Sequence, residues 1–144
     1  IKPHIPNSLS NSDIEYRVLC KRHANALNHA FKGIDPALNM FSTYDRGCLA
    51  EMKMMMPNIA RALIAERLPK DWRNIADELK LEGFHLNHEM LTKEQVEAIH
   101  SVGLAIRCYT VNKQMDMDRL VAFGVDTAIT DWPERFISLD KLIY

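Results

Sequence analysis

The sequence lacks the features that would assign it to several specialised classes of protein. Its 144 residues contain no apolar run long enough to cross a bilayer, so no membrane span is expected. The 18 basic and 19 acidic side chains leave a net charge of -1, and the basic residues are scattered. We therefore expect no nucleic-acid partner, because such a surface needs clustered positive charge.

Cysteine and glycine are also scarce. The three cysteines, Cys20, Cys48 and Cys108, are widely spaced and include no Cys-x-x-Cys pair. This argues against a zinc ribbon or a disulfide framework and suits a reducing compartment, with each thiol acting as a small apolar filler. The five glycines form no cluster, so a glycine-rich nucleotide loop is absent.

What the sequence does contain is a repeated alternation of helix and strand patterns. The first helix is expected from Ser12 to Gly33, and a capping box at Thr92 and Gln95 begins a later one. Strands are expected at residues 37–41, 62–64, 84–87, 104–111 and 126–130, and helical patterns lie between them. Such alternation predicts an α/β fold with right-handed crossovers and a parallel sheet.

Two architectures fit this pattern. One is a doubly wound, flavodoxin-like sheet of five strands, and the other is part of a (β/α)₈ barrel. The strands carry polar residues at alternate positions, which share one face of the sheet. A polar face of this kind suits the interior of a barrel near its mouth. His85 shares a face with Asn87, and Arg107 shares a face with Tyr109. The opposite, helix-covered face receives Leu86, Ile106 and Cys108.

The polar residues on this face of the sheet have an alternative explanation. Arg107 could simply pair with Glu82 or Glu66. A metal site is not expected, because His85 and His88 are three residues apart on a strand and point to opposite faces. No Gly-x-Ser-x-Gly elbow is present, so the residues alone indicate no complete catalytic constellation.

Several passages together resemble the glycerophosphodiester phosphodiesterases, most of all their cytosolic bacterial members. The matching passages are Ile1-Lys2-Pro3, Phe41-Ser42-Thr43-Tyr44, Arg61–Leu68, His85-Leu86-Asn87-His88, Tyr109-Thr110-Val111-Asn112, Gly124-Val125-Asp126 and Thr130-Asp131-Trp132-Pro133. The resemblance implies a (β/α)₈ TIM barrel of the phospholipase-C-like type. It also implies a hydrolase that cleaves glycerophosphodiesters into glycerol 3-phosphate and an alcohol.

The resemblance further implies a pair of catalytic histidines and a divalent cation, Mg²⁺ or Ca²⁺, held by carboxylates. The family's His-Arg-Gly loop, paired acids and second histidine belong to an N-terminal part that this chain lacks, so we expect no catalytic residue and no metal ligand here. By resemblance, Lys2 would face the phosphate, and Asn87 and Tyr109 would line the pocket. Asn112 is expected to be a helix cap.

The sequence begins at Ile1 without an initiator Met, so something upstream was removed or the chain belongs to a longer one. We predict that residues 1–144 form one incomplete domain, the C-terminal five or so βα units of a barrel. Alone it should be inactive, and a missing half or a second copy should cover its open edges. We expect a cytoplasmic protein. The alternative is a non-catalytic βα binding module, either a pseudoenzyme or a self-associating half-barrel.

Overall fold

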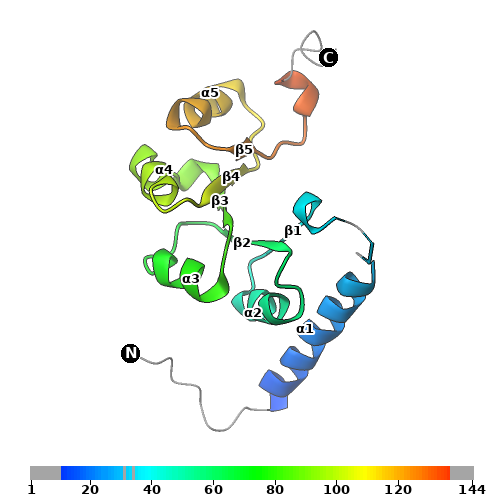
Figure 1. The fold of residues 1–144 in the computed structure, drawn as a ribbon. Helices are drawn as coiled ribbons and strands as arrows, with labels where there is room; N and C mark the ends of the chain where they lie inside the picture. Colours follow the sequence, from blue (N-terminus) through cyan, green and yellow to red (C-terminus); the bar gives the residue numbers. More distant parts are fainter. Residues whose placement is uncertain (1–10, 31, 34, 137–144) are drawn as a thin grey trace.

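The computed structural model describes residues 11–30, 32–33 and 35–136, and these residues form alternating helices and strands (Figure 1). Lys2 lies outside the described residues. The elements in chain order are α1 (Asn11–Ala30), the 3₁₀ turn η1 (Pro36–Leu38), β1 (Met40–Thr43), α2 (Arg46–Met55), β2 (Ala60–Ala65), α3 (Trp72–Leu79), β3 (Gly83–Asn87), η2 (His88–Met90), α4 (Lys93–His100), β4 (Ala105–Tyr109), α5 (Gln114–Phe123), β5 (Thr127–Ala128) and η3 (Pro133–Arg135).

The sheet has the strand order β1-β2-β3-β4-β5, and every neighbouring pair is parallel. A doubly wound sheet would reverse its order at a switch point, so the flavodoxin-like alternative is wrong. Consecutive right-handed crossovers place the connecting helices on one face. Figure 1 shows α2, α3, α4 and α5 along one side of the row of strands.

The sheet curves toward the face that carries no helices. The hydroxyl oxygens of Tyr44 and Tyr109 lie 3.2 Å apart, although β2 and β3 separate their strands. Three inter-strand spacings of about 4.8 Å each separate β1 from β4 in a flat sheet. Two tyrosine side chains meet across that span because the sheet bends, as a barrel wall does. The fold is thus the predicted α/β fold with a parallel sheet, curved as in part of a (β/α) barrel.

The main core lies between the sheet and its helices. Leu86, Ile106 and Cys108 are at most 1% exposed and belong to this core, as their strand parity predicted. Trp72 of α3 packs edge-on against Phe84, with ring centroids 6.1 Å apart. A second, smaller core between α1 and α2 contains Ala24, Met52, Met56 and Ile59. Met52 and Met56 therefore fill the space beside α1 in the helix layer.

Most predicted boundaries hold within about three residues, and the first strand begins three residues later than expected. The expected strand at residues 37–41 is a 3₁₀ turn at Pro36–Leu38 followed by β1 at Met40–Thr43. Asp35 caps the turn by accepting a hydrogen bond from the Ala37 amide, and Pro36 is suited to the first helical position. The predicted capping box of Thr92 and Gln95 is present in both directions.

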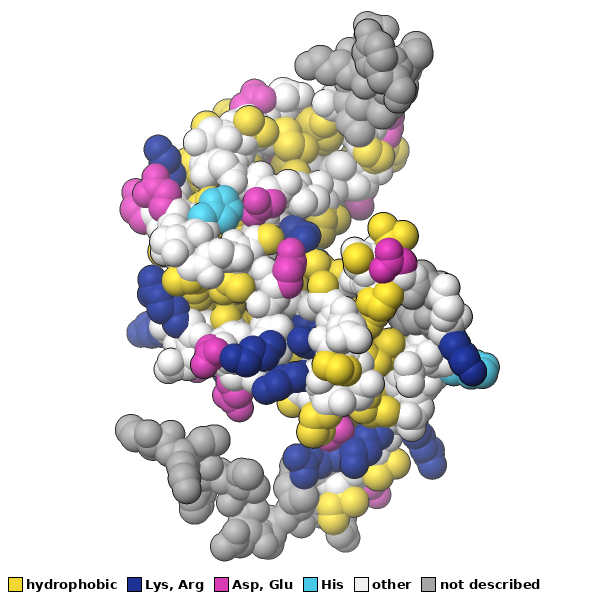
Figure 2. All heavy atoms as spheres, in the orientation of Figure 1, with side chains coloured by type: hydrophobic (Ala, Val, Ile, Leu, Met, Phe, Trp, Pro, Cys, Tyr) yellow, Lys and Arg dark blue, Asp and Glu magenta, His cyan; other side chains and the backbone are white. Residues whose placement is uncertain are grey.

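The described part of the chain leaves two strands with one neighbour each. β1 pairs with β2, and β5 pairs with β4. Large hydrophobic side chains are exposed on several elements, and Figure 2 shows such side chains in patches between charged ones. They include Leu38, Tyr44, Met115, Val121 and Trp132. No described helix is both long and apolar enough to cross a membrane.

Candidate functional site

The candidate site lies at the carboxyl-terminal edge of the sheet, where parallel strands end together. Asn87 and Tyr109 are the last residues of β3 and β4 and are direct register partners. Tyr44 follows β1 directly, and Glu66 follows β2 directly. We call these four residues the strand-end cluster. The sequence predicted the places of Asn87 and Tyr109, and the structure brings them together.

Asn87 connects the cluster to the backbone. Its Nδ2 donates a hydrogen bond to Glu66 Oε2 at 2.9 Å. Its Oδ1 accepts a hydrogen bond from the Glu89 amide at 3.0 Å, which caps η2. Asn87 therefore caps a turn and also lies at the strand-end edge of the sheet. The cap fixes the amide orientation that presents Nδ2 to Glu66.

Tyr109 is held as a neutral phenol. Its oxygen accepts a hydrogen bond from the Tyr44 hydroxyl at 3.2 Å. Burial raises the pKa of Tyr109 above its ordinary value, and the neighbouring Tyr44 and the charge of Glu66 raise it further. The phenol therefore keeps its proton throughout the neutral range and remains a hydrogen-bond donor.

Glu66 and Tyr44 are the members of the cluster that the sequence did not single out as site residues. Each stands one position beyond a strand, which is where barrel enzymes collect functional side chains. With correct strand boundaries, this rule alone would have predicted both residues as candidate site residues. Glu66 is exposed and Tyr44 is 60% exposed, so both are accessible to a ligand.

A second polar pair includes Arg107, which lies two residues before Tyr109 on β4. Arg107 makes two hydrogen bonds to the carboxylate of Glu82, at 2.9 and 3.2 Å. The expectation that Arg107 forms a plain ion pair is confirmed for Glu82, and the alternative partner Glu66 is wrong. This bidentate pair uses two of the five guanidinium donors and offsets the positive charge of Arg107.

His85 is the register partner of Arg107 and is 8% exposed. Its Nε2 has no hydrogen-bond partner among the described residues. Burial lowers the pKa of His85, and the positive charge of Arg107 lowers it further. His85 is therefore a neutral imidazole on the inner face of the sheet.

The loops after β4 and β5 are fastened together by Asn112. Its Oδ1 accepts hydrogen bonds from Thr130 Oγ1 at 3.0 Å and from the Asp131 amide at 3.1 Å. Its Nδ2 donates to Asp131 Oδ2 at 2.8 Å. The expectation that Asn112 caps a helix is wrong, because the residue at the N-terminal cap of α5 is Lys113. Asn112 instead holds the loop that follows Tyr109.

The two histidines around Asn87 do not share a ligand. His88 is 7% exposed, and its carbonyl oxygen accepts a hydrogen bond from Arg119 Nη2 at 2.9 Å. Its Nδ1 lies 3.9 Å from Asp116 Oδ1. Within residues 11–30, 32–33 and 35–136, no group of three or more His, Cys, Asp or Glu side chains is arranged to hold a metal ion.

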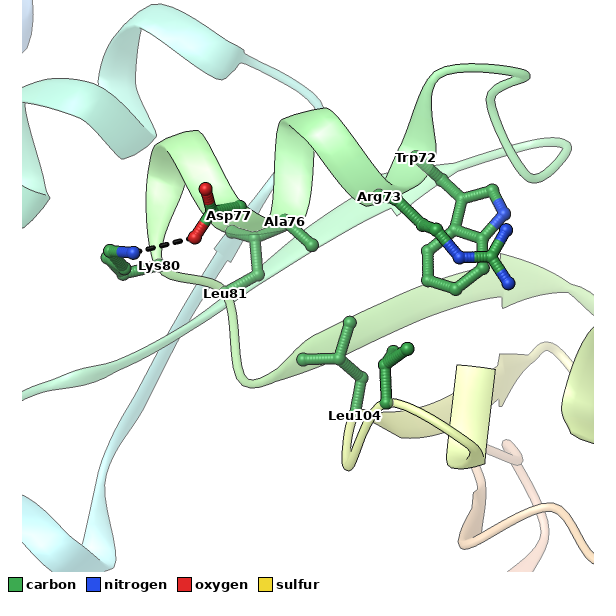
Figure 3. A pocket seen from close by; sticks show the side chains of 8 residues that line it. Trp72, Arg73, Ala76, Asp77, Lys80, Leu81 and Leu104 are labelled. Carbon is green, nitrogen blue, oxygen red and sulfur yellow. Dashed lines mark hydrogen bonds and ion pairs between the residues drawn. The ribbon is translucent and has the colours of Figure 1, made fainter. Parts of the chain in front are cut away.

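A separate hollow of about 420 Å³ lies in the helix layer beside α3 (Figure 3). Trp72, Ala76, Leu81 and Leu104 give it an apolar lining, and the exposed pair of Lys80 and Asp77, 2.7 Å apart, stands at its rim. No residue of the strand-end cluster lines this hollow. It is therefore distinct from the candidate site.

Comparison with known proteins identifies the family. Residues 4–135 match the glycerophosphoryl diester phosphodiesterase family, which is most of the chain, and the chain belongs to that family. It is 28% identical over 135 residues to an uncharacterised Bacillus subtilis protein and 28% identical over 102 residues to a Bacillus altitudinis glycerophosphodiester phosphodiesterase. These matches cover 92% and 69% of this chain but 54% and 42% of the relatives, so it spans about half of their length.

A solved structure gives the same fold. An Oleispira antarctica phosphodiesterase, determined in complex with the product sn-glycerol-3-phosphate, superposes with a TM-score of 0.76 at 24% identity. The match covers 81% of this chain and 48% of that protein. The chain therefore corresponds to about half of a phosphodiesterase barrel.

Proposed function

We propose that the protein containing this chain hydrolyses glycerophosphodiesters to glycerol 3-phosphate and an alcohol, and that the strand-end cluster lines its substrate pocket. The observation that carries the proposal is the meeting of Glu66, Asn87 and Tyr109 at the carboxyl-terminal edge of the sheet. Barrel enzymes bind substrate at that edge. The family membership and the product bound by the Oleispira enzyme support the choice of substrate.

The chemistry of the cluster suits a glycerol phosphate. The exposed carboxylate of Glu66 accepts hydrogen bonds, which matches the hydroxyl groups of glycerol. The neutral phenol of Tyr109 and the amide of Asn87 donate hydrogen bonds without bringing negative charge close to a phosphodiester. Lys2 remains a prediction for phosphate binding, because it lies outside the described residues.

The Mg²⁺ or Ca²⁺ that the family resemblance implies does not fit the described residues. The strand-end cluster offers a single carboxylate, Glu66, and that carboxylate is already hydrogen-bonded to Asn87. Oxygen-coordinated cations of this type usually need several carboxylate or carbonyl ligands. We assign no metal-dependent step to these residues, and the proposed cation would be held by other parts of the enzyme.

We propose that these 144 residues are inactive when isolated. The described part offers no cation cage and no pair of histidines at the strand ends, and the relatives are about twice as long. The open sides of β1 and β5 and the exposed hydrophobic side chains favour a covering partner, either the remaining half of a barrel or a second copy. We also propose a cytoplasmic location, supported by the free thiols.

The test is release of glycerol 3-phosphate from glycerophosphocholine, glycerophosphoethanolamine and glycerophosphoinositol by the full-length protein. Asn87→Ala is expected to lower kcat/KM about tenfold or more, because it removes the hydrogen bond that orients Glu66. Asn58→Ala, at an exposed residue before β2, is the matched control and should leave kcat/KM unchanged.

Two results would contradict the proposal. The first is hydrolysis by the full-length protein that Asn87→Ala and Tyr109→Phe leave unaltered, which would remove the strand-end cluster from the pocket. The second is a folded full-length protein that binds glycerophosphodiesters in calorimetry but releases no glycerol 3-phosphate. That result would favour the non-catalytic binding module.

A further inference from the structure

The contact between α1 and α2 contains two cysteines that lie far apart in the sequence. The Sγ atoms of Cys20 in α1 and Cys48 in α2 are 2.7 Å apart, although 28 residues separate them along the chain. Cys20 is 4% exposed and Cys48 is half-buried. Their wide spacing in the sequence concealed this proximity, and neither residue is merely an isolated apolar filler.

Cys48 is held at the start of α2, close to α1. The Cys48 amide donates a hydrogen bond to Asp45 Oδ1 at 2.9 Å, which fixes the first turn of α2. The Tyr16 hydroxyl of α1 lies 3.9 Å from Cys48 Sγ. A Cβ atom added at Gly47 would approach the Tyr16 ring to 3.1 Å, so the two helices pack closely at this point.

We propose that Cys20 and Cys48 are a modification site at which a disulfide oxidant such as oxidised glutathione closes a reversible intramolecular disulfide. The sulfur atoms in a disulfide are about 2.05 Å apart, so closure needs a movement of under about 1 Å. The bond would join α1 to α2 and tie the N-terminal helix to the first turn after β1.

The chemistry with oxidised glutathione balances without any further reactant. One cysteine thiolate attacks a glutathione sulfur, which releases one glutathione thiolate and leaves a mixed disulfide. The second cysteine thiolate attacks the protein sulfur of that mixed disulfide and releases the second glutathione. Two cysteine thiols thus lose two protons and two electrons, and one glutathione disulfide becomes two glutathione thiols.

The environment sets the rate of this reaction. Burial, the largest cause, and the neighbouring Cys20 together raise the pKa of Cys48 to about 11. The charge of Asp45 also raises this pKa, whereas a hydrogen bond from Tyr16 lowers it. Cys48 therefore stays a thiol near neutral pH, and closure accelerates as the pH rises toward that pKa.

The test is peptide mapping of the full-length protein after exposure to oxidised glutathione at mildly alkaline pH. Free thiols are blocked, and the protein is digested with trypsin without reduction. Trypsin cleaves between the two cysteines, at sites that include Lys21 and Arg46. The expected product joins the peptide of residues 18–21 to that of residues 47–53, and a dithiol reductant should separate them.

A thermal measurement gives a second readout. The oxidised protein should have a Tm higher by roughly 5 °C or more than the reduced protein, because the bond closes a loop of 28 residues. Cys48→Ala should remove the shift. Cys108→Ala is the matched control, because Cys108 is fully buried in the other core, and it should retain the cross-linked peptide.

Several results would overturn the proposal. They are glutathione left on Cys20 or Cys48 as a mixed disulfide, a cross-link to Cys108, a cross-link between two copies, or two unmodified thiols after prolonged oxidation. The wild-type peptide map decides the question without any variant. A failure of Cys48→Ala to fold therefore does not remove the test.

Discussion

The two edges of the sheet satisfy their polar groups in opposite ways. At the amino-terminal edge, the guanidinium of Arg61 on β2 is 6% exposed and donates only to backbone carbonyl oxygens. These belong to Met56, Pro57, Ile59, Leu79 and Lys80, in the segments that lead into β2 and β3. At the carboxyl-terminal edge, the strand-end cluster is satisfied mainly by its own side chains.

Under the proposed function, this difference separates residues that stabilise the fold from residues that bind the substrate. Backbone carbonyls cannot move away without disturbing the fold, so the hydrogen bonds of the buried Arg61 guanidinium are part of the framework. Side chains such as Glu66 and Tyr44 are exposed and can exchange a neighbour for a substrate hydroxyl at little cost. Under the proposed function, the amino-terminal edge contributes the framework and the carboxyl-terminal edge binds the substrate.

The largest effect is expected at the amino-terminal edge. Arg61→Met should lower the free energy of unfolding by about 3 kcal/mol, because it leaves five buried or partly buried carbonyl groups without this donor. Urea unfolding of the full-length protein followed by circular dichroism measures the change. Arg67→Met, at an exposed residue beyond β2, is the control and should change stability by less than about 0.5 kcal/mol.

An equal loss of stability in the two arginine variants would contradict this comparison. It would mean that the carbonyl groups around Arg61 find water or other donors when the guanidinium is removed. The two edges would then differ in composition but not in their contribution to folding.

The reverse behaviour is expected at the carboxyl-terminal edge. Glu66→Gln should change the free energy of unfolding by no more than about 0.5 kcal/mol, because Glu66 is exposed. It should lower the pKa of Tyr109, since a negative charge that opposes ionisation is lost. An ultraviolet titration of tyrosine measures the pKa, and the glycerol 3-phosphate assay should record a kcat/KM reduced by about tenfold.

Glu78→Gln provides the matched control, because Glu78 is exposed in the last turn of α3, away from the strand ends. It should leave both the tyrosine titration and kcat/KM unchanged. A Glu66→Gln variant with full activity and an unaltered titration would show that Glu66 neither contacts substrate nor acts on Tyr109. Glu66 would then be an ordinary surface residue.

Local rules were sufficient to predict much of this fold from the sequence. Strand parity placed Leu86, Ile106 and Cys108 in the core correctly, because neighbouring side chains on a strand must face opposite ways. The capping box of Thr92 and Gln95 depends on four consecutive residues and was also predictable. The polar inner face followed from the same parity.

Contacts between distant segments could not be predicted in this way. The meeting of Tyr44 with Tyr109 depends on the curvature of the whole sheet, and the meeting of Cys20 with Cys48 depends on helix packing. Asn112 was misassigned because a polar residue after a strand resembles a helix cap until its partner Thr130 is placed nearby. These are tertiary facts without a local signature.

The smallest expected effect concerns His85, which lies between the two edges. Its pKa is lowered by burial and then by Arg107, so below the ordinary value of 6.5 the unfolded chain binds a proton more readily than the folded protein. The stability from this residue is fully present above pH 6.5 and declines as the pH falls, by at most about 1.4 kcal/mol per pH unit. His85→Gln should remove that part of the decline in urea unfolding between pH 7 and pH 5. His29→Gln, at an exposed residue of α1, is the control for the loss of a histidine. If the wild type and the two variants show the same pH dependence, burial on the inner face does not oppose protonation of His85.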